Sequence, residues 1–349
     1  MILSMSLFAF VGCAKEEAPA TNEPAAEEPA AEEPATEEPA EGSVKTGLAV
    51  ISSVEKSADA GEKDGLAETD SVVVAVTVDQ EGKIVRAEID SAQTKINFSK
   101  EGKILSDLEA AYKSKQELGT EYGMSKASTL GKDWFEQANA LEEYVVGKTV
   151  EEIKGIEVDE KGVPTEADLV SSVTIKINDY KEAIEKAVGN AQDLGASADD
   201  KLGLGVLTTI SKSKDVAADA EGLAQAYSTY TVTTFDEDGK VTSCVIDASQ
   251  SNVNFDATGK ISTDLTVAPK TKVELGDEYG MKKASAIGKE WFEQADAFSK
   301  YAVGKTVEEI KGIAVDEEGT ATEADLVSSV TIGIDVFQEI IEKANVTAK

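Results

Sequence analysis

The chain has 349 residues and a formal net charge of −33, and it contains no histidine. This charge argues against nucleic acid as a partner, because binding to phosphates needs basic residues. The missing histidine excludes His-based acid–base catalysis, Ser-His-Asp hydrolysis and most transition-metal sites, so we predict no catalytic residue and no metal ligand.

Residues 1–13 begin with a short apolar run, Ile2 to Gly12, that ends at Cys13. The run is far below the roughly 20 residues that span a bilayer, so it predicts a signal peptide. Small residues before a cysteine resemble the bacterial lipobox, which implies a lipid on Cys13 that anchors the protein to the extracellular face of the cell membrane. Phe10 replaces the usual Leu and no basic residue precedes the run, as expected if the start codon is placed too late. The alternative is a secretory peptide with an incidental cysteine.

Residues 14–42 are built from Glu, Ala and Pro, with ten Glu and one Lys. Repeated prolines block helix propagation and the like charges repel one another, so we predict a disordered tether. The tether carries −9 of the net charge of −33, which leaves about −24 for the rest of the chain. This remaining charge fits solubility in an extracellular setting.

The rest of the chain repeats itself. The ten residues EADLVSSVTI occupy Glu166–Ile175 and return at Glu323–Ile332, 157 positions later. A solenoid unit has about 20–50 residues, whereas this period is that of a domain. We therefore predict homologous domains at 43–192 and 200–349, joined by a linker at 193–199, each able to fold alone. A shared function should appear in both copies.

Hydrophobic periodicity gives each copy strands first and helices after. Alternating valines, an acidic Gly-Lys turn and a returning run predict a β-hairpin, with one strand before it at 47–54 and one after it at 94–98. Apolar residues at spacings of three and four predict a central helix, a short helix and a closing helix. This order predicts an α+β fold with helices packed on an antiparallel sheet. In the first copy the strands are 47–54, 71–79, 84–90 and 94–98, and the helices are 132–146, 149–154 and 178–188.

Two further features have structural explanations. Glu151-Glu152 and Glu308-Glu309 follow Thr149 and Thr306, where acidic residues stabilise the first turn of a helix. Cys244 has Ala87 as its counterpart in the other copy, which predicts a small buried residue on a strand and no shared disulfide or thiol chemistry.

The repeated segment resembles the end of the FMN-binding domain family, in which Asp, two residues, Ser, Gly, Ala and Thr precede a C-terminal helix. Asp168, Ser171 and Thr174 match this pattern in the first copy, and Asp325, Ser328 and Thr331 match it in the second. The resemblance implies FMN joined covalently to the Thr through its phosphate by a flavin transferase. It implies that the Asp orients a metal-bound FMN during that transfer. The order of hairpin, central helix, motif and closing helix agrees with the family over most of residues 43–349.

Both copies depart from the family pattern in the same way. Ser172 and Ser329 replace Gly, while Val173 and Val330 replace Ala. Gly allows a positive φ and a close approach of a ligand to the backbone, which Ser and a β-branched Val do not favour. The side chains then fill the space of a phosphate nest at a helix N-terminus. The strong β propensity of VSSVTI allows a plain strand here instead.

Two functions from different classes follow. With flavin bound, the chain is a surface-anchored electron carrier for extracellular electron transfer, which needs a redox partner and selects no substrate of its own. Without flavin, it is a non-redox surface binding or structural lipoprotein that kept the fold and lost the flavin site. A repeated set of large side chains forms the wall of the isoalloxazine site if flavin is bound, and it is ordinary core packing if flavin is absent. The set is Tyr122, Met124 and Trp134, with Tyr279, Met281 and Trp291.

Overall fold

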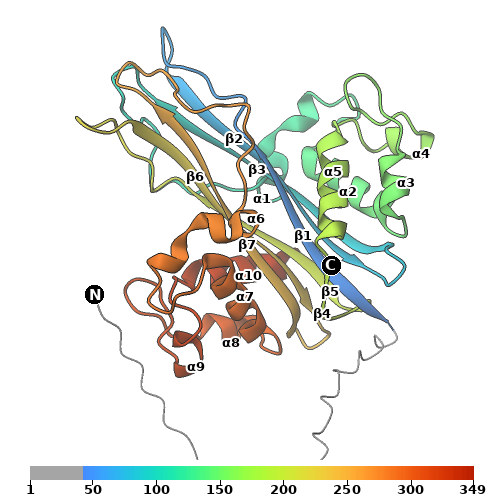
Figure 1. The fold of residues 1–349 in the computed structure, drawn as a ribbon. Coiled ribbons are helices and arrows are strands. Elements are labelled where there is room, and N and C mark those ends of the chain that lie inside the picture. Colours follow the sequence, from blue (N-terminus) through green and yellow to red (C-terminus); the bar gives the residue numbers. More distant parts are fainter. Residues whose placement is uncertain (1–41) are drawn as a thin grey trace, which may run out of the picture. The chain divides into compact units, whose positions relative to one another are not determined.

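The computed structural model describes residues 42–349, which all belong to one compact unit (Figure 1). The predictions of a signal peptide, of a lipid on Cys13 and of a tether fall on residues that lie almost wholly outside this described part. Within it the α+β fold class is confirmed, because each copy places antiparallel strands before the helices that pack on them.

Two antiparallel sheets form the centre of the unit. The first has the order β3-β2-β1-β4 and the second the order β5-β6-β7. The tight turn between β2 and β3 places Gly82 at a φ of 80°, which is the conformation that glycine adopts without strain. The strands are β1 (Ser43–Ser53), β2 (Gly65–Val78), β3 (Ile84–Phe98), β4 (Gln192–Ser197), β5 (Lys201–Thr209), β6 (Gly222–Phe235) and β7 (Val241–Phe255).

The predicted strand at 94–98 is wrong as a separate element. Residues 94–98 are the end of β3, which pairs with β2 without a break from Asp90 to Phe98. The second copy repeats this, since β7 is one strand of 15 residues. The reason is local, because the sequence between the two predicted strands, SAQ, has no Gly or Pro to interrupt the pairing.

The predicted linker at 193–199 lies mostly in a strand. Most of it belongs to β4, which pairs antiparallel with β1 through Lys45↔Asp193 and Thr46↔Gln192. An open sheet edge offers unpaired backbone groups, and the connecting chain satisfies those of β1. The polypeptide between the copies is therefore part of the first sheet.

The helices lie on the outer faces of the sheets (Figure 1). The predicted central, short and closing helices are confirmed within one or two residues, and Thr149 and Thr306 form the predicted capping boxes. Periodicity did not predict the short helices α1, α4, α6 and α9. The helices are α1 (Lys115–Leu118), α2 (Trp134–Val145), α3 (Val150–Lys154), α4 (Ala167–Val170), α5 (Asn178–Gly189), α6 (Lys272–Leu275), α7 (Trp291–Ala302), α8 (Val307–Lys311), α9 (Ala324–Val327) and α10 (Asp335–Thr347).

Each copy has its own hydrophobic core between its sheet and its helices. In the first copy Val74 and Val76 of β2 meet Leu141 of α2 and Ile184 of α5. The closing helices approach the sheets closely at glycines. A Cβ on Gly203 would lie 1.9 Å from the Ala344 carbonyl oxygen of α10. The buried Cys244 belongs to the corresponding core of the second copy, as predicted.

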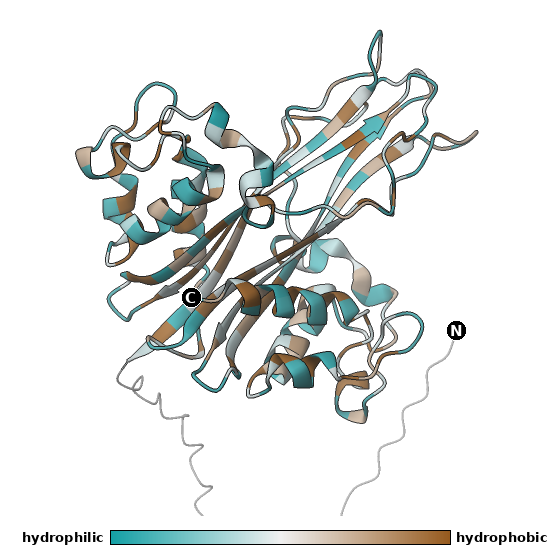
Figure 2. Cartoon of the chain, turned by 180° about the vertical axis from the view of Figure 1, so that it is seen from behind, coloured by the Kyte–Doolittle hydropathy of each residue, from teal (hydrophilic) through white to brown (hydrophobic). Residues whose placement is uncertain are grey.

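Two further hydrophobic clusters are shared by the copies. Val73 and Ala75, which alternate with the residues of the first core, meet Leu204 and Tyr230 of the second sheet. At the far ends of the long strands the rings of Phe98 and Phe255 stack with centroids 4.2 Å apart. Figure 2 shows hydrophobic segments on the crossing strands, helices that carry both hydrophobic and hydrophilic residues, and mainly hydrophilic turns. The molecule therefore has four layers, helices, sheet, sheet and helices.

The contacts between the copies come in equivalent pairs. The Ile261 N–H donates to Asp59 Oδ1 at 2.8 Å, and the Ile104 N–H donates to Asp215 Oδ1 at 2.8 Å. Lys186 pairs with Glu274, while its counterpart Lys343 pairs with Glu117. The two copies thus face each other with approximate two-fold symmetry. Whether each copy folds alone stays a prediction.

Candidate functional site

The repeated motif forms one short helix and a turn in each copy. Asp168 lies in α4 and Ser171 ends it, and both side chains are exposed. Leu169 and Val173 point the other way and are fully buried in the core of their copy. The alternative prediction of a plain strand is wrong here, because the backbone from Ala167 to Val173 makes helical and turn hydrogen bonds.

Thr174 is bound to a buried glutamine of the central helix. Its N–H donates to Gln137 Oε1 at 2.7 Å and its hydroxyl donates to the same oxygen at 3.1 Å. Gln137 has no exposed surface, and its amide group donates to Ser128 Oγ and the Lys132 carbonyl. This arrangement fixes the glutamine's orientation and holds the motif against α2.

The second copy repeats the arrangement. The N–H and hydroxyl of Thr331 donate to Gln294 Oε1 at 2.8 and 3.2 Å, and Gln294 donates to Ser285 and the Lys289 carbonyl. The sequence analysis missed both glutamines. A signal was available, because Gln137 and Gln294 stand in the repeated sequence WFEQA, but nothing in the sequence places them beside the motif.

The backbone donors of the motif are used within it. The N–H groups of Ser172 and Val173 both donate to the Leu169 carbonyl, at 3.0 and 2.9 Å. In the second copy those of Ser329 and Val330 donate to the Leu326 carbonyl, both at 2.8 Å. A phosphate nest needs N–H groups that point at the ligand. Since these donors and that of the following Thr already have acceptors, the motif residues do not fit a bound FMN phosphate.

The aromatic set is used mainly for packing. Trp134 is buried and its Nε1 donates to the Tyr180 hydroxyl at 3.1 Å, while Tyr122 and Met124 pack on the same core. The ammonium group of Lys115 lies over the rings of Trp134 and Tyr122, 5.5 and 5.0 Å from their centroids. A lysine of the chain therefore occupies a place over the ring faces where a flavin would stack.

Lys272, the counterpart of Lys115, is held more tightly. Its ammonium group donates to the Tyr227 hydroxyl at 2.8 Å and lies 4.8 and 4.7 Å from the ring centroids of Tyr279 and Trp291. Burial lowers the pKa of Lys272 to about 8, against the opposing charge of Asp247. The two copies differ because Asp70 stands where the second copy has Tyr227.

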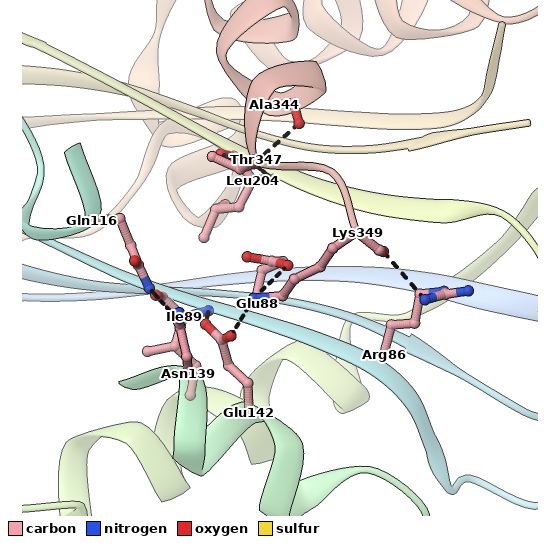
Figure 3. A network of polar contacts seen from close by, with 10 residues as sticks. All are labelled: Arg86, Glu88, Ile89, Gln116, Asn139, Glu142, Leu204, Ala344, Thr347 and Lys349. Atoms are coloured by element: carbon pink, nitrogen blue, oxygen red, sulfur yellow. Dashed lines mark hydrogen bonds and ion pairs between the residues drawn. The ribbon is translucent and has the colours of Figure 1, made fainter. Parts of the chain in front are cut away.

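A different polar site lies where the copies meet (Figure 3). Lys349 Nζ lies 2.6 Å from Glu142 Oε2 on α2 and 3.1 Å from Glu88 Oε1 on β3. Both glutamate side chains are almost fully buried, and Glu142 Oε1 accepts a hydrogen bond from the Ile89 N–H. Burial raises the pKa of Glu88 and of Glu142, and the charge of Glu142 raises that of Glu88 further.

Glu88 lines a cavity of about 690 Å³ between β3 of the first copy and α10 of the second. The walls include the apolar side chains of Leu204, Val206 and Val346. On one side Gln116 donates to the Asn139 side-chain oxygen at 3.0 Å, and both residues line the cavity. The six predicted site residues line neither this cavity nor the four smaller ones described with it. Sequence analysis missed this site because its residues come from both copies.

Comparisons with known proteins match only a short part of the chain. No family model matches the chain. A chlorophenol reductase from Desulfitobacterium hafniense is 50% identical over 42 residues, which are 12% of this chain and 13% of that protein. The chain thus matches a small part of that relative's length. No solved structure matches.

Two further features of residues 42–349 concern metals and membranes. No cluster of three or more Cys, Asp or Glu side chains in this part of the chain has the arrangement of a metal site. Among the helices of the same part, none combines the length and the apolar character that crossing a membrane requires.

Proposed function

We propose that this chain is a surface-anchored lipoprotein that works by non-redox binding and carries no FMN, although its motif resembles that of flavin-binding domains. The observation that supports this proposal most strongly is the bond between Thr174 and Gln137, which recurs between Thr331 and Gln294. In both copies the hydroxyl that would carry the flavin donates to the protein itself. Val173 and Val330 are buried, and their N–H groups donate to the Leu169 and Leu326 carbonyls within the motif.

The test is the mass and colour of the protein made in a host that secretes it and contains a flavin transferase. We expect an intact mass without FMN and no absorbance from flavin. Attachment of FMN to Thr174 and Thr331 would refute the proposal and would favour the electron carrier, with its transferase and redox partner. Thr174→Ala is then the control, because it should halve the bound flavin.

A restored site sharpens this test. Ser172→Gly with Val173→Ala gives the first copy the small residues of the family, and Gln137→Ala releases Thr174. If crowding and the glutamine are the obstacles, the triple variant should take up one FMN, whereas the second copy in the same molecule should stay empty. If neither protein takes up flavin, the resemblance extends no further than the order of the elements.

The anchor is a separate part of the proposal. It rests on the lipobox-like sequence before Cys13, since this residue lies outside the described part of the chain. One acyl chain binds a membrane only marginally, so stable attachment needs at least two. Cys13→Ala should move the protein from the membrane fraction to the medium, and a wild-type protein found wholly in the medium would contradict the anchor.

A further inference from the structure

We propose that the cavity between the copies binds a small organic ammonium ion with an apolar body, and that Glu88 is its counter-ion. This inference rests on the proposed function, since it names the ligand class of a non-redox binding protein. It concerns a site that involves neither the motif nor the aromatic set.

The first argument is the chemistry of Glu88 itself. Its side chain is only 7% exposed and it lines the cavity. Its Oε1 forms an ion pair with Lys349 Nζ at 3.1 Å, and no other donor among the described residues reaches that oxygen. The ammonium group of Lys349 is therefore shared by Glu88 and Glu142, and it lies closer to Glu142. Burial and the charge of Glu142 raise the pKa of Glu88 to about 8, and a second cation bound beside Glu88 favours its charged form.

The second argument comes from comparing the copies. Val245 stands where the first copy has Glu88, Val273 where it has Gln116, and Ser299 where it has Glu142. The equivalent cavity of the second copy, of about 510 Å³, is lined by both of these valines. The same fold thus forms with two valines and a serine at these positions. Packing does not require the polar groups that the first copy places around its cavity.

The charge balance of the lining favours a cation. The lysines there are already engaged, since Lys343 pairs with Glu117 and Lys349 pairs with Glu88 and Glu142. Asp90 is satisfied internally by the N–H groups of Ser91 and Gln116. Five acidic residues and two basic ones line the cavity: Glu88, Asp90, Glu117, Glu339 and Glu342, with Lys343 and Lys349.

The size and the walls define the rest of the ligand. A volume of about 690 Å³ is within the range of small-molecule sites, which are about 300–1,000 Å³. Leu204 and Val206 on β5 and Val346 on α10 supply apolar surface opposite Glu88. The ammonium of Lys349 shows which group the carboxylates accept, and its aliphatic chain shows that methylene groups fit beside them. A short alkylammonium or a diamine has these properties.

The test is calorimetric titration of the full chain with butylammonium and with 1,5-diaminopentane. We expect saturable binding that weakens as salt rises, and none of 1-butanol, which has a similar body without the charge. Glu88→Gln should weaken binding at least about tenfold, because it removes the counter-ion. Glu88→Val should do the same, and the second copy shows that the fold accepts valine at this position.

The matched control is Asp296→Asn. It removes one negative charge from the second copy and gives that copy the residue that the first has at Asn139. Binding should be unchanged. Equal weakening by Asp296→Asn would mean general attraction to an acidic surface and would overturn the proposal. Three other results would also overturn it: binding of 1-butanol, absence of amine binding, or amine binding that both Glu88 variants retain. Intact mass is measured on the same sample, so FMN would refute the proposed function whatever the amine result.

Discussion

Replacing Phe98 or Phe255 with alanine should destabilise both copies together. Each ring has no exposed surface, and the two rings stack at 4.2 Å with an interplanar angle of 12°. Truncating a buried phenylalanine costs about 3–5 kcal/mol of unfolding free energy. Because each ring is the other's neighbour, the double variant should lose less than the sum of the single ones, by about 0.5–1.5 kcal/mol.

The assay uses the two tryptophans of the chain as local reporters, since Trp134 lies in the first copy and Trp291 in the second. Urea unfolding is followed by fluorescence in Trp134→Phe and Trp291→Phe backgrounds, each with and without Phe255→Ala. If the copies unfold as one unit, both reporters should show the same lowered midpoint. The control is Val267→Ala, which alters a side chain that is 62% exposed and should shift neither midpoint.

The result that would refute this reasoning is a Phe255→Ala variant in which the Trp291 midpoint falls and the Trp134 midpoint stays. The copies would then be independent domains, as the repeat by itself predicts, and the shared clusters would contribute little. Strict additivity of the two alanine changes would show in addition that the stacked rings do not interact.

Three other outcomes are expected. Gly203→Ala should lower the free energy of unfolding by about 1–3 kcal/mol, because the added carbon pushes α10 away from the sheet. Gly189→Ala is the control and should leave that free energy unchanged, since the space around its added carbon is open. Thermal or urea unfolding measures both. Lys272→Met should raise the free energy of unfolding by about 1–3 kcal/mol below pH 8. The folded-state pKa of Lys272 is about 8, below the ordinary 10.5, so the wild-type protein becomes more stable as the pH rises from 8 to 10.5. In melting curves the difference between the variant and the wild type should therefore vanish near pH 10.5. Residues 200–349 expressed alone should melt cooperatively but self-associate in light scattering, because the apolar face of β5 and β6 is uncovered; a stable monomer would contradict the role of the shared clusters.

Some features of the site were within reach of the sequence and others were not. The repeated motif marked Thr174 and Thr331, and the unusual Ser-Val pair indicated crowding around them. The partner Gln137 was out of reach, because a glutamine 37 positions away meets the motif only after α2 packs on the sheet. Glu88 was also out of reach, because a function shared by the copies should appear in both and its counterpart is Val245.

The sequence by itself determined the α+β class, the two copies, the hairpins and the main helices, because alternation, helical spacing and capping are local properties of the chain. Only the tertiary structure decided that the second face of each sheet packs against the other sheet, that residues 192–197 complete the first sheet, and that a cavity lies between β3 and α10. Alternation predicts one buried face of a strand such as β2, but it does not show that Val73 and Ala75 on the other face are buried as well. The faces of the two sheets cover each other only in the folded protein. The contacts that join them, such as Phe98 with Phe255, are between residues more than 150 positions apart in the sequence.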